Sequence, residues 1–467
     1  MQLISTSFCM AIVTLTLCGC MSLKEVRTGE IATLPEMDIA TDAKFECESG
    51  REEASHVVAA VEEYKRYSLS FVELDDQGWF HSGRQLKLID DKLTKELANS
   101  NNKDVDFDVI VFVHGWHHNA YDSDCNVNEF RSMLTRAADR YDHFPGARKR
   151  RLVGVYIGWR GESVKPKLAS YFTVVDRKNT AEHVAKGQIR EVFALLRKHE
   201  IAANAPDRPG EPPHDRMRSM VMGHSFGGLI AFHGLSQAMV NDLEITRPTV
   251  ATGCGDAVSG ARPRGLAGSW PDLLVLINPA FEASRFEAIH DVVQRTTSGE
   301  SPCPYSESTV PKVVVVTADN DRWTGPAFVL ARKVETVFET YSVDSKNLEE
   351  SEREANLHTI GFDNRYRTHR LCQLGEPPVT MVSFTPSPNA KPEDVQDHGA
   401  PVWVVGAGKE IINGHDGFLY AGKTGDKSDP ILLNWLLDLH AGIRPNHALA
   451  TQPGLVAADS MCGEWSK

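Results

Sequence analysis

The sequence predicts an α/β protein whose core is a mostly parallel, doubly wound sheet. Short apolar runs recur along the chain, and a stretch compatible with a helix follows each of them. Apolar runs without alternation are typical of strands that are buried on both faces of a parallel sheet. Repetition of strand and then helix favours the same architecture. The runs are residues 109–113, 152–157, 219–222, 273–277 and 313–316.

Length and composition are those of one large globular domain with insertions. The chain has 467 residues, of which 41% are hydrophobic and 24% are charged. These values allow a sizeable buried core in a single decorated α/β domain. The net charge is -13 and there is no long run of Lys or Arg. A nucleic-acid partner is therefore not expected, since it would need a basic stripe to neutralise phosphates.

The first residues read as an export signal. Residues 3–19 contain no Asp, Glu, Lys or Arg and are mostly apolar, and they end in Leu17-Cys18-Gly19-Cys20. A run this short is typical of a cleaved signal peptide rather than of a permanent membrane span. The ending resembles the lipobox of bacterial lipoproteins, which implies that residues 1–19 are removed and that Cys20 is acylated. The alternative is an ordinary secretory signal, because no Lys or Arg precedes the apolar run.

Either signal exports the protein, and the lipobox implies a lipid anchor in the cell envelope. Met21 and Ser22 resemble the residues that sort lipoproteins to the outer membrane, facing the periplasm. Residues 20–55 lack clear periodicity, so we expect a tether before the domain of residues 56–467. No later stretch is apolar enough to span a bilayer. Six cysteines remain after the signal, and their even number in an oxidising compartment suggests up to three disulfides. They are Cys47, Cys125, Cys254, Cys303, Cys372 and Cys462.

The remaining elements follow in chain order. Residues 67–74 alternate as a strand does, residues 75–78 form a turn, and residues 84–97 are amphipathic. Residues 180–199 have helical spacing and predict one helix. Two long segments interrupt the rhythm, at about 241–269 and 339–400, and we interpret both as insertions. Loops of this length in a compact domain are often functional, which makes them candidates for a lid or a substrate-binding cap.

Gly223-His224-Ser225-Phe226-Gly227 has the G-x-S-x-G form of a nucleophile elbow. It follows a predicted strand and precedes a helix-compatible run, residues 229–239, as that motif requires. Glycines allow the close packing of strand and helix that lifts the serine above the sheet. The alternative is a simple glycine-rich turn. We predict that Ser225 is a nucleophile and that the N–H of Phe226 helps to stabilise an oxyanion.

Val113-His114-Gly115-Trp116 ends the most apolar strand. Hydrolases with this elbow use a His-Gly segment at the corresponding place to complete the oxyanion hole. We predict that the N–H of Trp116 is the second donor. His114, His117 and His118 could instead form a metal site. However, no carboxylate or histidine elsewhere in the sequence stands out as an additional ligand, so no metal is expected.

The general base should follow the last strand. Asn413-Gly414-His415-Asp416 comes after two apolar runs and before a helix predicted at residues 431–440. His415 is therefore the expected base. Other histidines lack this setting between a strand and a helix. They are His233, His290, His358, His369, His398, His440 and His447.

The third member should be an acid after the strand that lies between the serine and the histidine. Ala318-Asp319-Asn320-Asp321 follows the run at residues 312–317. Either carboxylate could hold the imidazole in the required tautomer. Asp321 is preferred because it lies further beyond the strand and has room to turn back. Asp319 stays open as the alternative acid, or as a turn residue that bonds to its own backbone.

These pieces, with Asn278-Pro279-Ala280, resemble the α/β-hydrolase superfamily, and in particular its bacterial lipase- and esterase-like members. They occur in the family's order over roughly residues 67–445. The resemblance implies an eight-stranded, mostly parallel sheet and ester hydrolysis through an acyl-enzyme, with no cofactor. The substrate would be a small-molecule or lipid ester. The competing interpretation is a catalytically silent binding or scaffold lipoprotein that kept only the fold.

Overall fold

The computed structural model describes most of the region that was expected to fold as a domain. It describes residues 24–35, 58–99, 102, 104–143, 148–161, 174–209, 211, 214–246, 270–297, 310–337, 339, 346–373, 379–383, 401–418 and 431–442.

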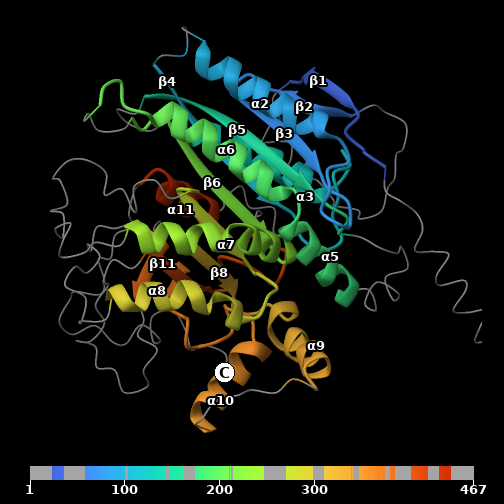
Figure 1. The fold of residues 1–467 in the computed structure, drawn as a ribbon, viewed down its shortest axis with the longest axis vertical. Coiled ribbons are helices and arrows are strands. Elements are labelled where there is room, and N and C mark those ends of the chain that lie inside the picture. Colours follow the sequence, from blue (N-terminus) through green and yellow to red (C-terminus); the bar gives the residue numbers. More distant parts are fainter. Residues whose placement is uncertain are drawn as a thin grey trace, which may run out of the picture.

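The described residues form one sheet of eleven strands in the spatial order β1-β2-β3-β5-β4-β6-β7-β8-β11-β9-β10 (Figure 1). The strands from β3 to β9 in this order are all parallel to their neighbours. β2 is antiparallel to β3, and β10 is antiparallel to β9. The bounds are β1 Gly29–Thr33, β2 Ala59–Glu63, β3 Tyr67–Glu73, β4 Val105–Val113, β5 Lys149–Gly158, β6 Met217–His224, β7 Leu273–Ile277, β8 Val313–Ala318, β9 His369–Gln373, β10 Val379–Ser383 and β11 Val402–Ala407.

Helices cover both faces of this sheet. In Figure 1, α2, α6, α7 and α8 lie in front of it, and their apolar side chains form one core. α3 and α11 pack on the other face and form a second core. In β4, Val109 and Val111 point to the first core, whereas Ile110 and Phe112 point to the second. The helix bounds are α2 Gly83–Ala98, α3 Cys125–Asp142, α5 Val174–Lys186, α6 Ile189–Asn204, α7 Phe226–Thr246, α8 Glu287–Thr297, α9 Phe328–Glu335, α10 Lys346–Leu357 and α11 Ile431–His440.

The α/β class and the parallel strands at the five apolar runs are therefore confirmed. The single helix expected at residues 180–199 is wrong, because α5 ends at Lys186 and α6 begins at Ile189. The break lies where Gly187 packs directly against Gly78. A Cβ atom on Gly187 would lie 2.4 Å from the Gly78 carbonyl oxygen. This contact joins segments far apart in the sequence, so helical spacing alone could not reveal it.

The expected number of eight strands is also wrong, because the sheet already has eleven strands in the described part of the chain. The segment of residues 339–400, interpreted as an insertion, supplies α10 and the β9–β10 hairpin, and β9 pairs with β11. In the segment of residues 241–269, residues 241–246 belong to α7, and residues 247–269 lie outside the described part. Short edge strands carry little periodicity, which is why the pattern does not show them.

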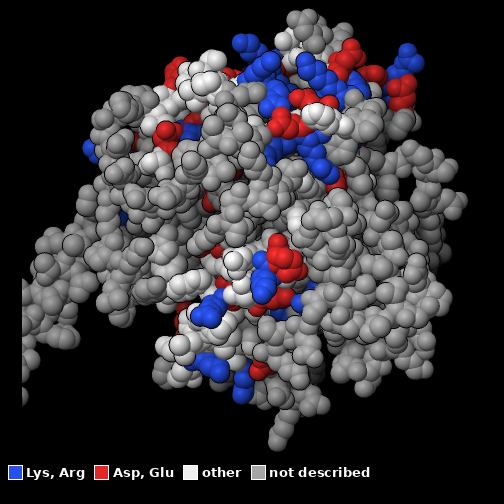
Figure 2. Space-filling view, turned by 180° about the vertical axis from the view of Figure 1, so that it is seen from behind, with Lys and Arg blue, Asp and Glu red and all other residues white. Residues whose placement is uncertain are grey.

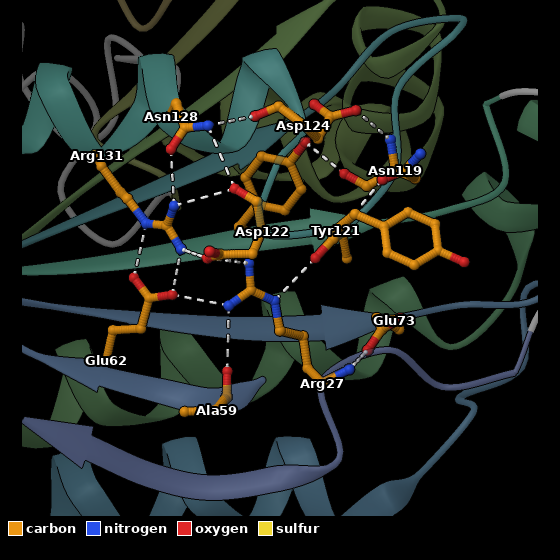
Figure 3. Close-up of polar contacts among 12 residues, drawn as sticks. Arg27, Ala59, Glu62, Glu73, Asn119, Tyr121, Asp122, Asp124, Asn128 and Arg131 are labelled. Atoms are coloured by element: carbon orange, nitrogen blue, oxygen red, sulfur yellow. Dashed lines mark hydrogen bonds and ion pairs between the residues drawn. The ribbon is translucent and has the colours of Figure 1, made fainter. Parts of the chain in front are cut away.

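Part of the expected tether also belongs to the fold, since residues 29–33 form β1. Just before β1, Arg27 is fully buried and its Nη1 lies 2.7 Å from Glu62 Oε1 (Figure 3). Arg131 on α3 also binds Glu62, through Nε at 2.9 Å. The Arg27 N–H donates to Glu73 Oε1 at 2.8 Å. Because β1 itself is mostly exposed, these buried charges rather than an apolar pattern fix the segment.

Charges of both signs are interspersed on the described part of the face in Figure 2. Among the ion pairs of the described residues are Arg140 with Asp438 and Arg218 with Asp215. Cys125, at the start of α3, is disulfide-bonded. Cys47, Cys254, Cys303 and Cys462 lie outside the described residues. Among the helices that the structure describes, none combines the length and the apolar character needed to cross a membrane.

Candidate active site

The candidate site lies at the carboxyl edge of the sheet. Ser225 follows β6, Asp321 follows β8 and His415 follows β11, while Gly115 and Trp116 follow β4. These strands are parallel, so their carboxyl ends lie at the same edge. Ligand sites in parallel α/β sheets are typically found at this edge.

A sharp turn between β6 and α7 exposes the serine to its partners. The backbone of Ser225 has a φ of 56°, a value that residues other than glycine rarely adopt. The turn can be this tight because α7 approaches the end of β4 closely at Gly227. A Cβ atom there would lie 2.0 Å from the Val113 carbonyl oxygen, so only glycine fits. Strained backbone of this kind often occurs at functional sites.

The structure brings together the three residues that the sequence singled out. His415 Nε2 lies 2.9 Å from Ser225 Oγ, and His415 Nδ1 lies 2.8 Å from Asp321 Oδ2. Ser225 and Asp321 are buried, while 14% of the His415 side chain is exposed. The imidazole can therefore accept the serine proton at one nitrogen while it donates to the carboxylate from the other.

The surroundings keep the acid ionised and the base strong. Burial raises the pKa of Asp321, but its hydrogen bond with His415 and the bond from Thr324 outweigh this effect, and the pKa is lowered. Burial lowers the pKa of His415, but the hydrogen bond and charge of Asp321 outweigh it, and the pKa is raised. The backbone N–H of Trp323 also donates to Asp321 Oδ1, at 2.8 Å. Together these contacts favour an imidazolium beside a carboxylate.

Asp319, the alternative acid, points elsewhere. Its Oδ2 accepts a hydrogen bond from Arg370 on β9 at 3.0 Å. Among the competing histidines, the described ones make other contacts, such as His440 with Asp108 and His358 with Glu354. His398 and His447 lie outside the described residues. Of the two carboxylates, Asp321 is the one that reaches His415.

The two segments that carry the expected oxyanion donors both adjoin Ser225. Phe226 is the first residue of α7, and the first N–H groups of a helix have no intrahelical partner. Gly115, which immediately precedes Trp116, lies against the serine. A Cβ atom on Gly115 would lie 3.0 Å from Ser225 Cβ. The backbone of the His-Gly segment therefore approaches Ser225 as an oxyanion hole would require.

His114, His117 and His118 do not form a group of converging metal ligands in the described part of the chain. His114 Nε2 accepts from the Trp159 N–H at 3.0 Å. His118 Nδ1 lies 3.1 Å from Asp124 Oδ1. Burial lowers the pKa of His118, but Asp124 outweighs it and raises the pKa to about 8. A protonated imidazole is a poor metal ligand.

Two other groups of described residues could hold a metal by proximity. One is His224 with His415 and Asp416, and the other is Glu287 with His290 and Asp291. In the first group, both ring nitrogens of His415 already contact Ser225 and Asp321. The second group is on α8 and is largely exposed. Neither group is needed to account for the arrangement around Ser225.

Asn278 belongs to the Asn-Pro-Ala segment after β7, and it connects three loops of the site. Its side-chain amide donates to the carbonyl oxygens of His415 at 2.7 Å and of Gly414 at 3.2 Å. Its Oδ1 accepts from the Ala318 N–H, at the end of β8, at 2.8 Å. Asn278 is fully buried and has a φ of 43°, a conformation that Asn tolerates better than most residues.

The backbone next to Asn278 also contacts the serine, since the Ala280 N–H donates to the Ser225 carbonyl oxygen at 3.1 Å. His224 supports the same histidine loop, because its Nε2 lies 2.9 Å from the His415 carbonyl oxygen. Burial lowers the pKa of His224 to about 3, so its ring is neutral. These partners meet only in the folded chain, and an Asn-Pro pair after a buried strand was the only sequence signal for them.

No family model matches the sequence, and no curated protein matches it. Among solved structures, the chain is similar to an uncharacterized protein from Pseudomonas aeruginosa, with 12% sequence identity and a TM-score of 0.23. That alignment covers 85% of this chain and 55% of the other. A likeness at this level carries no argument about fold or function.

Proposed function

We propose that this chain is a serine hydrolase that cleaves carboxylic esters with Ser225, His415 and Asp321. The observation that carries the proposal is the continuous chain of contacts from Ser225 Oγ to His415 Nε2, at 2.9 Å, and from His415 Nδ1 to Asp321 Oδ2, at 2.8 Å. An alcohol, an imidazole and a buried carboxylate in this order form the arrangement of a serine nucleophile with its base.

An α/β-hydrolase fold belongs to the same proposal. It is supported by the strained serine turn between β6 and α7, and by the chain order of serine, acid and histidine, which that fold uses. The parallel sheet with helices on both faces is compatible with it. The three strands beyond the expected eight would be elaborations of the core.

In the first step, His415 accepts the Ser225 proton at Nε2 while the serine oxygen attacks the acyl carbonyl. The N–H groups of Phe226 and Trp116 would donate to the oxyanion that forms. Each such donor typically contributes about 3 kcal/mol of transition-state stabilisation. The C–O bond of the ester then breaks, and His415 returns the proton to the leaving alkoxide.

In the second step, water hydrolyses the acyl-enzyme by the same route. His415 removes a proton from water, the resulting hydroxide attacks the acyl carbonyl, and Ser225 leaves as an alkoxide that takes the proton back. The ionised Asp321 stabilises the imidazolium in both steps without itself becoming protonated. The chemistry we propose uses only these side chains and backbone N–H groups.

The substrate class we propose is an ester with an apolar acyl group. The ring centroids of Trp116 and Trp323 lie 6.1 Å apart beside the candidate site, and 43% of Trp323 is exposed. Aromatic surfaces of this kind favour apolar groups. The proposed location is the cell envelope, through acylation of Cys20. The disulfide at Cys125 supports an oxidising compartment.

The test is replacement of the nucleophile. Ser225→Ala should fold as the parent protein does, lose hydrolysis of a p-nitrophenyl ester and resist labelling by a fluorophosphonate. A matched control is Ser284→Ala, because the Ser284 hydroxyl contacts Asn356 rather than a histidine. The control should keep both properties.

Labelling that persists in Ser225→Ala would mean that another residue is the nucleophile. If the parent protein neither hydrolyses esters nor reacts with the probe, the silent scaffold becomes the better explanation. We favour the hydrolase over the silent scaffold, because the serine, the imidazole and the carboxylate are all present and in contact.

A further inference from the structure

The short helix α9, Phe328–Glu335, presents apolar side chains to solvent rather than to the core. Leu330, Val334 and Val337 are 68%, 72% and 67% exposed, and Trp323 just before the helix is 43% exposed. Leu330 and Val334 are four residues apart on α9, so they lie on one side of this helix, and Val337 follows in the turn after it. We call these four residues the α9 stripe. An exposed apolar row of this kind usually marks an interaction site.

The opposite side of α9 is held inward by ion pairs. Arg332 is buried, and its Nη1 lies 3.0 Å from Glu282 and 2.6 Å from Glu335. Lys178 on α5 also binds Glu282. Breaking a buried, paired charge is costly. The helix therefore cannot rotate to bury the stripe without losing these contacts, and its outward apolar face is a fixed feature of the fold.

The stripe is continuous with the candidate active site. It begins two residues after Asp321, and the Trp323 N–H donates to that carboxylate at 2.8 Å. The Trp323 ring meets the Trp116 ring edge-on, with centroids 6.1 Å apart. An apolar surface that touches the stripe would therefore reach the residues that flank Ser225.

Two exposed cations border the stripe. Arg322 immediately precedes Trp323, and Lys333 lies between Leu330 and Val334. Neither makes an ion pair with any residue that the structure describes. Unpaired cations beside an apolar face complement a surface that is apolar within and anionic at its boundary, as an anionic lipid bilayer is.

The N-terminal segment points to the same occupant. Arg27 is fixed at the carboxyl edge of the sheet, because its N–H binds Glu73, the last residue of β3, and its Nε binds the Ala120 carbonyl oxygen beyond β4. Cys20 lies seven residues upstream of Arg27. Seven extended residues span at most about 25 Å. An acyl chain on Cys20 would therefore hold this edge, which also carries α9, close to the bilayer.

We propose that the α9 stripe docks on an anionic phospholipid bilayer, so that Ser225 faces esters held in the membrane surface. This inference deepens the proposed function and rests on it, because it assigns the substrate to lipid esters at an interface. Trp323, Leu330, Val334 and Val337 enter the boundary between headgroups and acyl chains, while Arg322 and Lys333 contact lipid phosphates.

The test uses the mature chain from residue 20 onward with Cys20→Ser, which keeps all described residues and removes the proposed lipid. Binding to vesicles of phosphatidylcholine with roughly one third phosphatidylglycerol is measured by co-sedimentation, beside pure phosphatidylcholine. Replacing Leu330→Ser and Val334→Ser together should weaken binding about tenfold or more. Replacing Arg322→Gln and Lys333→Gln should weaken binding to the anionic vesicles about fivefold for each cation.

The matched control is Ile201→Ser. Ile201 is 59% exposed on α6, near the start of β6 and hence at the opposite edge of the sheet, and its replacement should leave vesicle binding unchanged. Hydrolysis of a soluble p-nitrophenyl ester is measured in parallel. Failure of the parent chain to bind vesicles, while it still hydrolyses the soluble ester, would overturn the docking proposal alone. Binding to vesicles without any ester hydrolysis would instead overturn the proposed function.

Two further results would contradict membrane docking. One is equal vesicle binding by the parent chain and the Leu330→Ser, Val334→Ser variant. The other is a dimer of the parent chain that this variant abolishes, since the stripe would then be an interface with a second copy. The expected result is a monomer whose vesicle binding falls when the stripe is made polar.

Discussion

His415 contacts Ser225 with one ring nitrogen and Asp321 with the other, so its protonation decides whether the proposed reaction can begin. Only the neutral imidazole can accept the serine proton. The pKa of His415 is lowered by burial but raised more strongly by Asp321. The acidic limb of the activity profile should therefore lie above the ordinary histidine pKa of about 6.5.

Asp321→Asn tests this coupling. The variant keeps the shape of the side chain but removes the charge that favours the imidazolium, so burial alone then acts on His415. The pH at which activity rises should move to lower values, and the rate should fall by up to about ten-thousandfold. The measurement is the pH profile of kcat/KM for a soluble ester. An unchanged acidic limb would show that Asp321 does not set the protonation of His415.

Asn278 acts at the same scale, through the position of the histidine loop. Asn278→Asp keeps the acceptor for Ala318 and tolerates the same φ, but it replaces the donor to the His415 and Gly414 carbonyl oxygens with a second oxygen. We expect kcat to fall about tenfold to a hundredfold, with KM little changed, because the ester does not contact Asn278. The unfolding free energy should also fall by about 1–3 kcal/mol.

If the KM of Asn278→Asp rises by as large a factor as its kcat falls, the result would argue against a positioning role. Thr368→Val is a suitable control. Thr368 also bonds across neighbouring strands, to Val404, but it does not contact the histidine loop. Its replacement should lower stability without changing the kcat of the folded enzyme.

At the scale of elements, the N-terminal strand β1 is held mainly by charge. Glu62 on β2 binds both Arg27 and Arg131, and all three are buried (Figure 3). Burial raises the pKa of Glu62, but its bonds and ion pairs with these arginines outweigh it, and the pKa is lowered. The stabilisation is therefore present above the ordinary Glu pKa and is lost as the pH falls through the lower value in the folded chain.

Glu62→Gln should lower the unfolding free energy by about 3–5 kcal/mol at neutral pH, because two guanidinium groups lose their buried counter-charge and keep only the exposed Asp122. Urea unfolding at two pH values measures the effect, which should shrink in acid. The control is Lys87→Ala, which breaks an exposed pair with Asp91 on α2 and should cost less than about 0.5 kcal/mol. Equal costs for both variants would contradict a structural role for the buried cluster.

At the scale of the whole molecule, the parallel sheet brings the functional parts to one edge. Ser225 and His415 are separated by 190 residues, and Asp321 and His415 by 94. These three residues each follow a different parallel strand. The α9 stripe and Arg27, where the N-terminal segment joins the fold, lie at the same edge of the sheet. A sheet of this kind can thus combine a reaction, a binding face and an anchor without an additional domain.

The sequence alone indicated the α/β class, the buried central strands and the residues of the candidate site. Short stretches of sequence were enough for these predictions, because apolar runs indicate buried strands and the elbow motif indicates a specific turn. Only the tertiary structure separated Asp321, which binds His415, from Asp319, which binds Arg370. It also supplied Asn278 as a bridge, the outer strands β1, β9 and β10, and the outward face of α9. These features depend on contacts between distant residues, and a periodicity of two or 3.6 residues along the chain does not record such contacts.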